Sequence, residues 1–191
     1  TIERLAAETL EGLKQSPLET VAECSDLRWL HIKDPFLYER TSNDLNLLFC
    51  SHPFSWSSSN TGYVIRKAGE STYSKPVYDF FPRGTTWDVA MTRGTAVVDV
   101  PQLGEFAQET VSLFFYDGGE CVRDLEEHNS AVKRPRGYSC EELGGLAYVT
   151  TEPVEQVTRL SRYQPMFVSP QGTGCSRYVD VLTTTDGMYA T

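Results

Sequence analysis

The sequence predicts an α+β fold, in which N-terminal helices precede a mostly antiparallel β-sheet that is curved or barrel-like. Two observations carry this prediction. In residues 1–50 apolar side chains recur at helical spacing, and beyond residue 60 the pattern changes to short β-branched and aromatic runs bounded by Gly or Pro. We therefore expect one domain over residues 1–191, with a helical segment over 1–59 and an antiparallel β region over 60–191.

Three helix starts are expected in the first segment. The stretch "TIERLAAETLEGLKQ" gives one apolar stripe, formed by Ile2, Leu5, Ala6, Leu10 and Leu13. A second helix is predicted after "SPLE", because Ser16 suits an N-cap, Pro17 the first helical position and Glu19 a capping box. Asp34-Pro35 signals the third start, and the linker "SHPFSWSSSNTG" ends the helical segment.

The β region is predicted to hold about nine strands at intervals typical of sandwiches or barrels. Hairpins are expected around Thr92-Arg93-Gly94, at Asp117-Gly118-Gly119 and at Asp186-Gly187, with a short helix in "LGEFAQET". The remaining strands are expected in "GYVIRKAG", "PVYDFFPRG", "LAYVTTEP", "EQVTRLSRY" and "PMFVSP". At the level of the fold alone, this architecture is similar to lipocalin-like barrels.

Composition narrows the classes of function. The net charge of −9 argues against a nucleic-acid-binding protein, and the basic cluster Lys133–Arg136 reads as a solvated loop or an anion contact. No apolar run approaches the roughly 20 residues of a membrane span. The five cysteines lack paired spacing, which predicts reduced thiols, a cytoplasmic location and no metal site.

Three cysteines are candidates for an enzyme site. Cys121 lies seven positions before His128, so the two side chains meet only if the chain turns between them. Cys50 and His52 share one side of an extended chain, although His52 could instead cap a helix end before Pro53. Cys175 follows a glycine-rich stretch without a nearby histidine. An enzyme with a cysteine or acid–base site therefore remains one alternative.

The preferred hypothesis is a binding domain for an apolar, acidic small molecule such as a pigment, lipid or tetrapyrrole, acting as a carrier or chaperone-type lyase. A curved sheet rich in aromatic residues can enclose a pocket, and an inward arginine would bind a carboxylate. The sequence identifies no cofactor. The ligand-binding candidates are Arg66, Trp87, Arg93, Tyr116, Tyr148 and Arg177.

Two alternatives to a ligand pocket stay open. The arginines could face solvent or pair with strand acids such as Asp88, Asp99 and Asp180. The protein could also be an interaction or assembly module that binds a partner protein through its helical segment or an edge strand, which predicts an exposed apolar surface.

Overall fold

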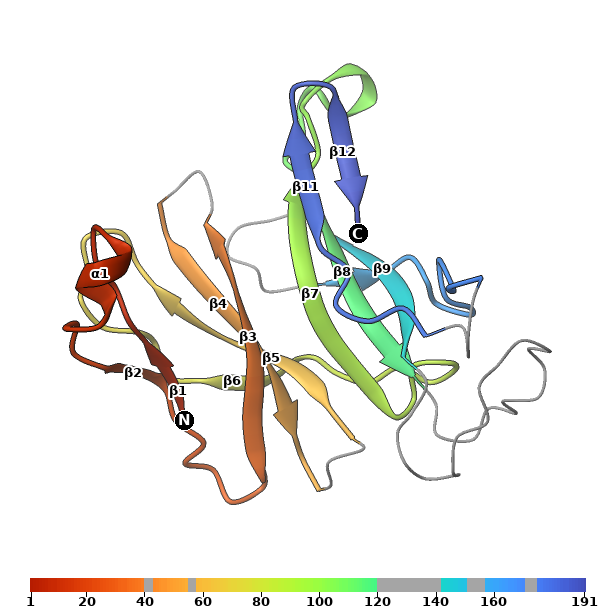
Figure 1. Ribbon diagram of the computed structural model, residues 1–191. Helices are drawn as coiled ribbons and strands as arrows, with labels where there is room; N and C mark the ends of the chain where they lie inside the picture. The colour runs from red at the N-terminus through yellow and green to blue at the C-terminus, as the bar shows by residue number, and fades with distance from the viewer. Residues whose placement is uncertain (40–42, 55–57, 120–141, 151–156, 171–174) are drawn as a thin grey trace.

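The computed structural model describes residues 1–39, 43–54, 58–119, 142–150, 157–170 and 175–191. These residues are almost entirely β-structure (Figure 1). The strands are β1 (Ile2–Arg4), β2 (Glu19–Ala22), β3 (His31–Glu39), β4 (Leu45–His52), β5 (Asn60–Arg66), β6 (Val77–Phe81), β7 (Met91–Asp99), β8 (Ser112–Gly119), β9 (Leu143–Val149), β10 (Thr158–Arg159), β11 (Val181–Thr184) and β12 (Gly187–Ala190). They form two four-stranded antiparallel sheets, ordered β3-β4-β5-β6 and β10-β9-β8-β7, and two hairpins, β1-β2 and β11-β12.

The prediction of N-terminal helices is wrong. The predicted first helix is reduced to the four-residue α1 (Leu10–Leu13), capped by the Thr9 hydroxyl, and the other two predicted helix starts lie beside or within strands. Leu5 and Leu10, which belong to the predicted apolar stripe, are 47% and 80% exposed. So short a helix is marginal by itself in water. The core face of this segment is instead supplied by β1 and β2.

Asp34 and Pro35 mark a bulge in β3 rather than a helix start. Between Lys33 and Phe36 the strand gains one residue relative to β4, and Asp34 takes a positive φ of 51°. A bulge on an edge strand is one of the few sheet positions that tolerate proline. The extra residue also switches the buried face of β3, because side chains alternate along a strand.

The described elements form three layers (Figure 1). One face of the β3-β4-β5-β6 sheet packs against the β1-β2 hairpin, through Ile2, Val21, Ala22, Ile32, Leu47, Phe49, Val64 and Tyr78. The other face packs against the second sheet, through Tyr38, Leu48, Phe81, Trp87, Phe114, Tyr116, Leu143 and Ala147. Large aromatic side chains thus fill the space between the two sheets.

The turn predictions had mixed outcomes. The hairpin predicted around Thr92–Gly94 is wrong, since β7 runs through it, and β8 likewise continues through Asp117–Gly119. The predicted strands matching β5 and β6 and the hairpin turning near Asp186-Gly187 are confirmed. The short helix predicted in "LGEFAQET" is a single 3-10 turn, η1 (Gly104–Phe106).

The prediction of a barrel-like sheet is also wrong for the described residues. Each four-stranded sheet has two ends in its strand order, so neither sheet closes on itself. No helix among the described residues is long and apolar enough to cross a membrane.

Candidate functional site

Arg93 is a buried cation on β7 surrounded by three carboxylates. It lies opposite Asp117 in the β7-β8 register and is 2% exposed. Its Nε and Nη2 donate to Asp117 Oδ2 at 3.2 and 2.6 Å, Nη2 also donates to Glu142, and Nη1 donates to Asp34 at 3.4 Å. We call Arg93, Asp34, Asp117 and Glu142 the Arg93 cluster. The carboxylates that Arg93 binds are therefore the protein's own.

Electrostatics keep the guanidinium of Arg93 charged. Burial lowers the pKa of Arg93, but the charges of Glu142 and Asp117 outweigh burial and raise it, so the guanidinium stays protonated. Burial raises the pKa of Asp117, while the Arg93 charge acts in the opposite direction. Removing one partner of a buried ion pair of this kind is destabilising, because it leaves the other charge unpaired in the interior.

The Arg93 cluster holds the segment that leads into β11. Arg177 Nε donates to Glu142 Oε2 at 2.8 Å, and the Tyr178 amide donates to Asp117 Oδ2 at 3.0 Å. The centroid of the Tyr178 ring lies 4.0 Å from the guanidinium carbon of Arg93, which is a cation–π contact. Tyr178 has a positive φ of 54°. These contacts fix the start of the C-terminal hairpin.

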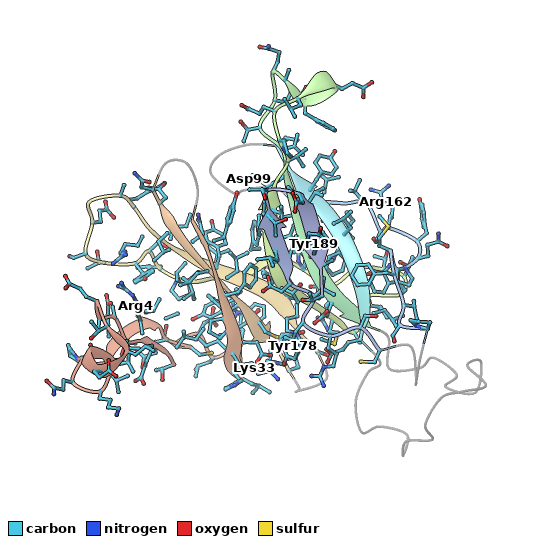
Figure 2. All side chains as sticks on the ribbon, turned by 45° about the horizontal axis from the view of Figure 1, so that its top comes forward. Arg4, Lys33, Asp99, Arg162, Tyr178 and Tyr189 are labelled. Atoms are coloured by element: carbon cyan, nitrogen blue, oxygen red, sulfur yellow. The ribbon has the colours of Figure 1, made fainter. Side chains whose placement is uncertain are left out.

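Beyond this anchor the β11-β12 hairpin projects at the top of the molecule, beside the β7-β8 connection (Figure 1). Figure 2 shows Tyr178 at its base and Tyr189 on the hairpin. From Leu182 to the end of the chain every residue is exposed, and Leu182, Met188 and Tyr189 are 62%, 43% and 54% exposed. The two strands carry no charged side chain. A two-stranded hairpin without a packed face is marginally stable in water.

The outer edge of β12 presents backbone groups away from β11. Asp180 and Thr191 exchange both backbone hydrogen bonds, at 3.2 and 3.0 Å, and Leu182 lies opposite Tyr189. Hydrogen-bonded and non-hydrogen-bonded pairs alternate in an antiparallel ladder, so Tyr189 bonds inward and Met188 and Ala190 direct their N–H and C=O groups outward. β11 contacts β7, and within the described ranges β12 is hydrogen-bonded to no strand other than β11.

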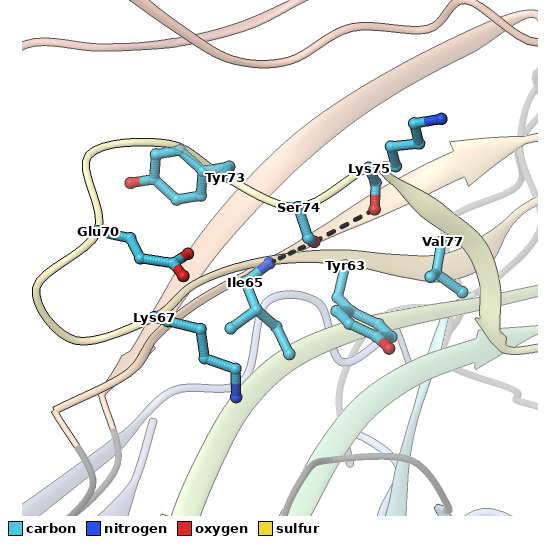
Figure 3. A pocket seen from close by; sticks show the side chains of 8 residues that line it. All are labelled: Tyr63, Ile65, Lys67, Glu70, Tyr73, Ser74, Lys75 and Val77. Atoms are coloured by element: carbon cyan, nitrogen blue, oxygen red, sulfur yellow. Dashed lines mark hydrogen bonds between the residues drawn. The ribbon is translucent and has the colours of Figure 1, made fainter.

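A separate pocket of about 420 Å³ lies beside the β5-β6 connection (Figure 3). Figure 3 shows Ser74 bridging this connection to β5: its hydroxyl accepts from the Ile65 amide at 3.0 Å and donates to the Lys75 carbonyl at 3.2 Å. Apolar and cationic side chains both line the pocket, whose lining residues are Tyr63, Ile65, Lys67, Glu70, Tyr73, Ser74, Lys75 and Val77.

Cys50 and His52 share one face of β4, as expected for an extended chain. Cys50 Sγ lies 3.4 Å from His52 Nε2, and both residues are buried. Burial raises the pKa of Cys50 to about 11, so the thiol is protonated at neutral pH, whereas a nucleophile needs the thiolate. His52 does not cap a helix end, because it is the last residue of β4.

The six predicted ligand-binding residues fall into separate places. Arg93 and Arg177 meet through Glu142, whereas Trp87 and Tyr116 stack in the core with ring centroids 5.7 Å apart. Arg66 on β5 lies over the Tyr73 ring, and Tyr148 on β9 is half-buried.

Several other predictions concern acids and cysteines. Arg159 pairs with the buried Asp88 at 2.8 Å. Cys121, His128 and Lys133–Arg136 lie outside the described residues. Cys175 is half-buried, and Cys24 and Cys50 are free thiols. Within the described ranges no group of three His, Cys, Asp or Glu side chains is placed to hold a metal ion.

Sequence reasoning missed Asp34, Glu142 and Tyr178 as partners of Arg93. The available signal was weak: Asp117 was interpreted as a turn residue, and Tyr178 follows Arg177 directly. The hairpin itself was predicted, but its projection from the molecule was not.

Comparisons of the chain with protein-family models, with curated proteins and with solved structures find no match.

Proposed function

We propose that this chain is a protein-interaction module that accepts a β-strand on the outer edge of β12. The observation that supports the proposal best is the edge of β12 itself. All residues of β12 are exposed, and none of them is charged or a proline. Edge strands of this kind are usually protected by lysine, proline, a bulge or a covering element. A partner strand would use the outward groups of Met188 and Ala190 for main-chain hydrogen bonds, as in β-strand addition.

The fixed base of the hairpin supports the same proposal. The base of the hairpin is fixed by Arg177 and Tyr178 on the Arg93 cluster, and Val179 beside them is buried. An edge that is held in place loses less conformational freedom on binding than a free segment. Arg93 and Arg177 thus act on binding indirectly, by positioning the docking element.

A peptide selection on the whole chain tests this function. Extended ten-residue peptides, displayed as a random library, are selected on the wild-type protein, and their affinity for variants is measured by fluorescence anisotropy. Ala190→Pro removes an outward N–H at an edge position that proline tolerates, and should weaken selected peptides by about tenfold, the size of a lost hydrogen bond with added clash. Ala190→Val keeps the N–H and should bind like wild type. Equal affinity for both variants contradicts the proposal.

A second candidate function, binding of an apolar and acidic small molecule, is favoured by the pocket beside the β5-β6 connection. Its volume falls in the range of ligand sites, and Tyr63 and Val77 offer apolar surface near Lys67 and Lys75. Anilinonaphthalene sulfonate serves as the probe. Lys75→Ala should weaken its binding while Lys14→Ala, on a surface elsewhere, should not, and equal effects contradict this function.

A further inference from the structure

We infer that the strand accepted by β12 is the β12 strand of a second copy of this chain, related by a two-fold axis. This inference rests on the proposed function and identifies its partner. Two-fold dimers are the commonest oligomers, and their interface must be complementary to itself. The β12 edge meets this condition in its hydrogen bonds, its side chains and its charge.

The hydrogen-bond pattern selects one register. A two-fold axis perpendicular to the sheet places even-numbered residues opposite even-numbered residues and odd-numbered residues opposite odd-numbered ones. Only residues whose N–H and C=O groups point away from β11 can form hydrogen bonds across the interface. With Tyr189 on the axis, Met188 of each copy lies opposite Ala190 of the other, and all the outward groups of both strands are used. With Met188 on the axis, Ala190 falls opposite Asp186, which lies in the hairpin turn. The Tyr189-centred register is therefore favoured.

Side chains in this register form continuous rows over four strands. Leu182 and Tyr189 lie opposite each other in the hairpin, so one face of the dimer sheet carries Leu182 and Tyr189 from both copies in a single apolar row. Both residues are more than half exposed in one copy. Cross-strand aromatic pairs stabilise sheets, and a sheet of more than two strands with an apolar face can be stable where a lone hairpin is not.

The distribution of charge favours a second copy over a basic partner. The strands Val181–Thr184 and Gly187–Ala190 contain no charged residue, and the acids that flank β12 and β11, Asp186 and Asp180, lie at the turn and at the base. In the Tyr189-centred register neither Asp186 nor Asp180 lies opposite an acid of the other copy. A basic peptide would find no carboxylate along the paired strand.

Disulfide trapping tests the register on the whole chain. Non-hydrogen-bonded antiparallel pairs have Cα atoms about 4.5 Å apart, so Tyr189→Cys should form a dimer when two thiols are oxidised by glutathione disulfide, which is reduced to two glutathione molecules. Leu182→Cys is the matched control, because it is equally exposed but separated from its copy by three strand spacings, roughly 14 Å. We expect about tenfold more disulfide dimer from Tyr189→Cys than from Leu182→Cys or the wild-type protein.

Mass spectrometry of the 189–189 linked peptide separates this dimer from links through the native cysteines. Light scattering of the unmodified protein should show its mass rising from 21.5 kDa towards twice that value with concentration, and Ala190→Pro should prevent the rise. A constant monomer mass without trapping overturns the dimer. If selected peptides still bind and Ala190→Pro still weakens them, the proposed strand addition stands with another partner; if neither is seen, both proposals fail.

Discussion

At the scale of single residues, Arg93 organises more of the molecule than any motif in its neighbourhood suggests. Its guanidinium joins β7 to β8 through Asp117, to the β3 bulge through Asp34 and to the start of β9 through Glu142. The same carboxylates hold Arg177 and the Tyr178 amide. One buried side chain therefore connects the two sheets with the base of the projecting hairpin.

Substitution of Arg93 by alanine should destabilise the fold strongly. It leaves Asp117 and Glu142 buried without their shared cation, a situation that costs about 3–5 kcal/mol. Arg177→Ala is the control: Arg177 is 45% exposed and Glu142 keeps Arg93, so the loss should stay below about 1 kcal/mol. Urea unfolding followed by tryptophan fluorescence measures both free energies of unfolding. Equal losses in the two variants would show that the cluster does not depend on Arg93.

At the scale of secondary-structure elements, the hairpin and the central strands are built differently. β8 lies between β7 and β9 and its Phe114 and Tyr116 are buried. The β11-β12 hairpin has one ladder and exposed side chains on both faces. Elements with few buried apolar contacts open locally at low free energy.

Amide hydrogen exchange should separate these two kinds of element. In dilute solution, the ladder amides of Leu182 and Tyr189 should exchange at least about a hundredfold faster than those of Phe114 and Tyr116, because opening the hairpin exposes little new apolar surface. Two-dimensional NMR after transfer to deuterium oxide gives the rates residue by residue. Comparable protection in both elements would mean that the hairpin packs on another part of the molecule.

At the scale of the whole molecule, the packing of the two sheets depends on a close approach at Gly94. Gly94 on β7 faces the aromatic layer, where an added Cβ would lie 2.6 Å from Phe114 Cζ and 3.0 Å from Phe36 Cε1. Phe114 is fully buried and in contact with Phe81 from the other sheet. The absence of a side chain at position 94 therefore lets the sheets meet.

Gly94→Ala should lower the free energy of unfolding by about 1–3 kcal/mol, the usual cost of overpacking. If the Phe114 ring is the cause, the added methyl group should cost less in a Phe114→Leu background, which provides the control. Denaturant unfolding of the two single variants and the double variant gives the coupling energy. Strictly additive losses would contradict this packing of the sheets.

The sequence predicted those parts of the fold that local signals control. The turn near Asp186-Gly187 and the strands β5 and β6 follow from turn residues and from runs of β-branched and aromatic side chains. The N-terminal segment was predicted incorrectly, because spacings such as Ile2 to Leu5 suit a helix while burial favours strands. The Arg93 cluster was missed because Asp117 and Glu142 lie 24 and 49 positions away from Arg93.

The sequence by itself determined β5, β6 and the hairpin that turns near Asp186-Gly187, since these depend on neighbouring residues. Only the tertiary structure decided that the N-terminal segment joins a sheet, that aromatic side chains fill the space between the sheets, and that Arg93 binds carboxylates of its own chain. These outcomes depend on which distant surfaces meet, because burial and charge pairing outweigh the small local preferences for helix or strand.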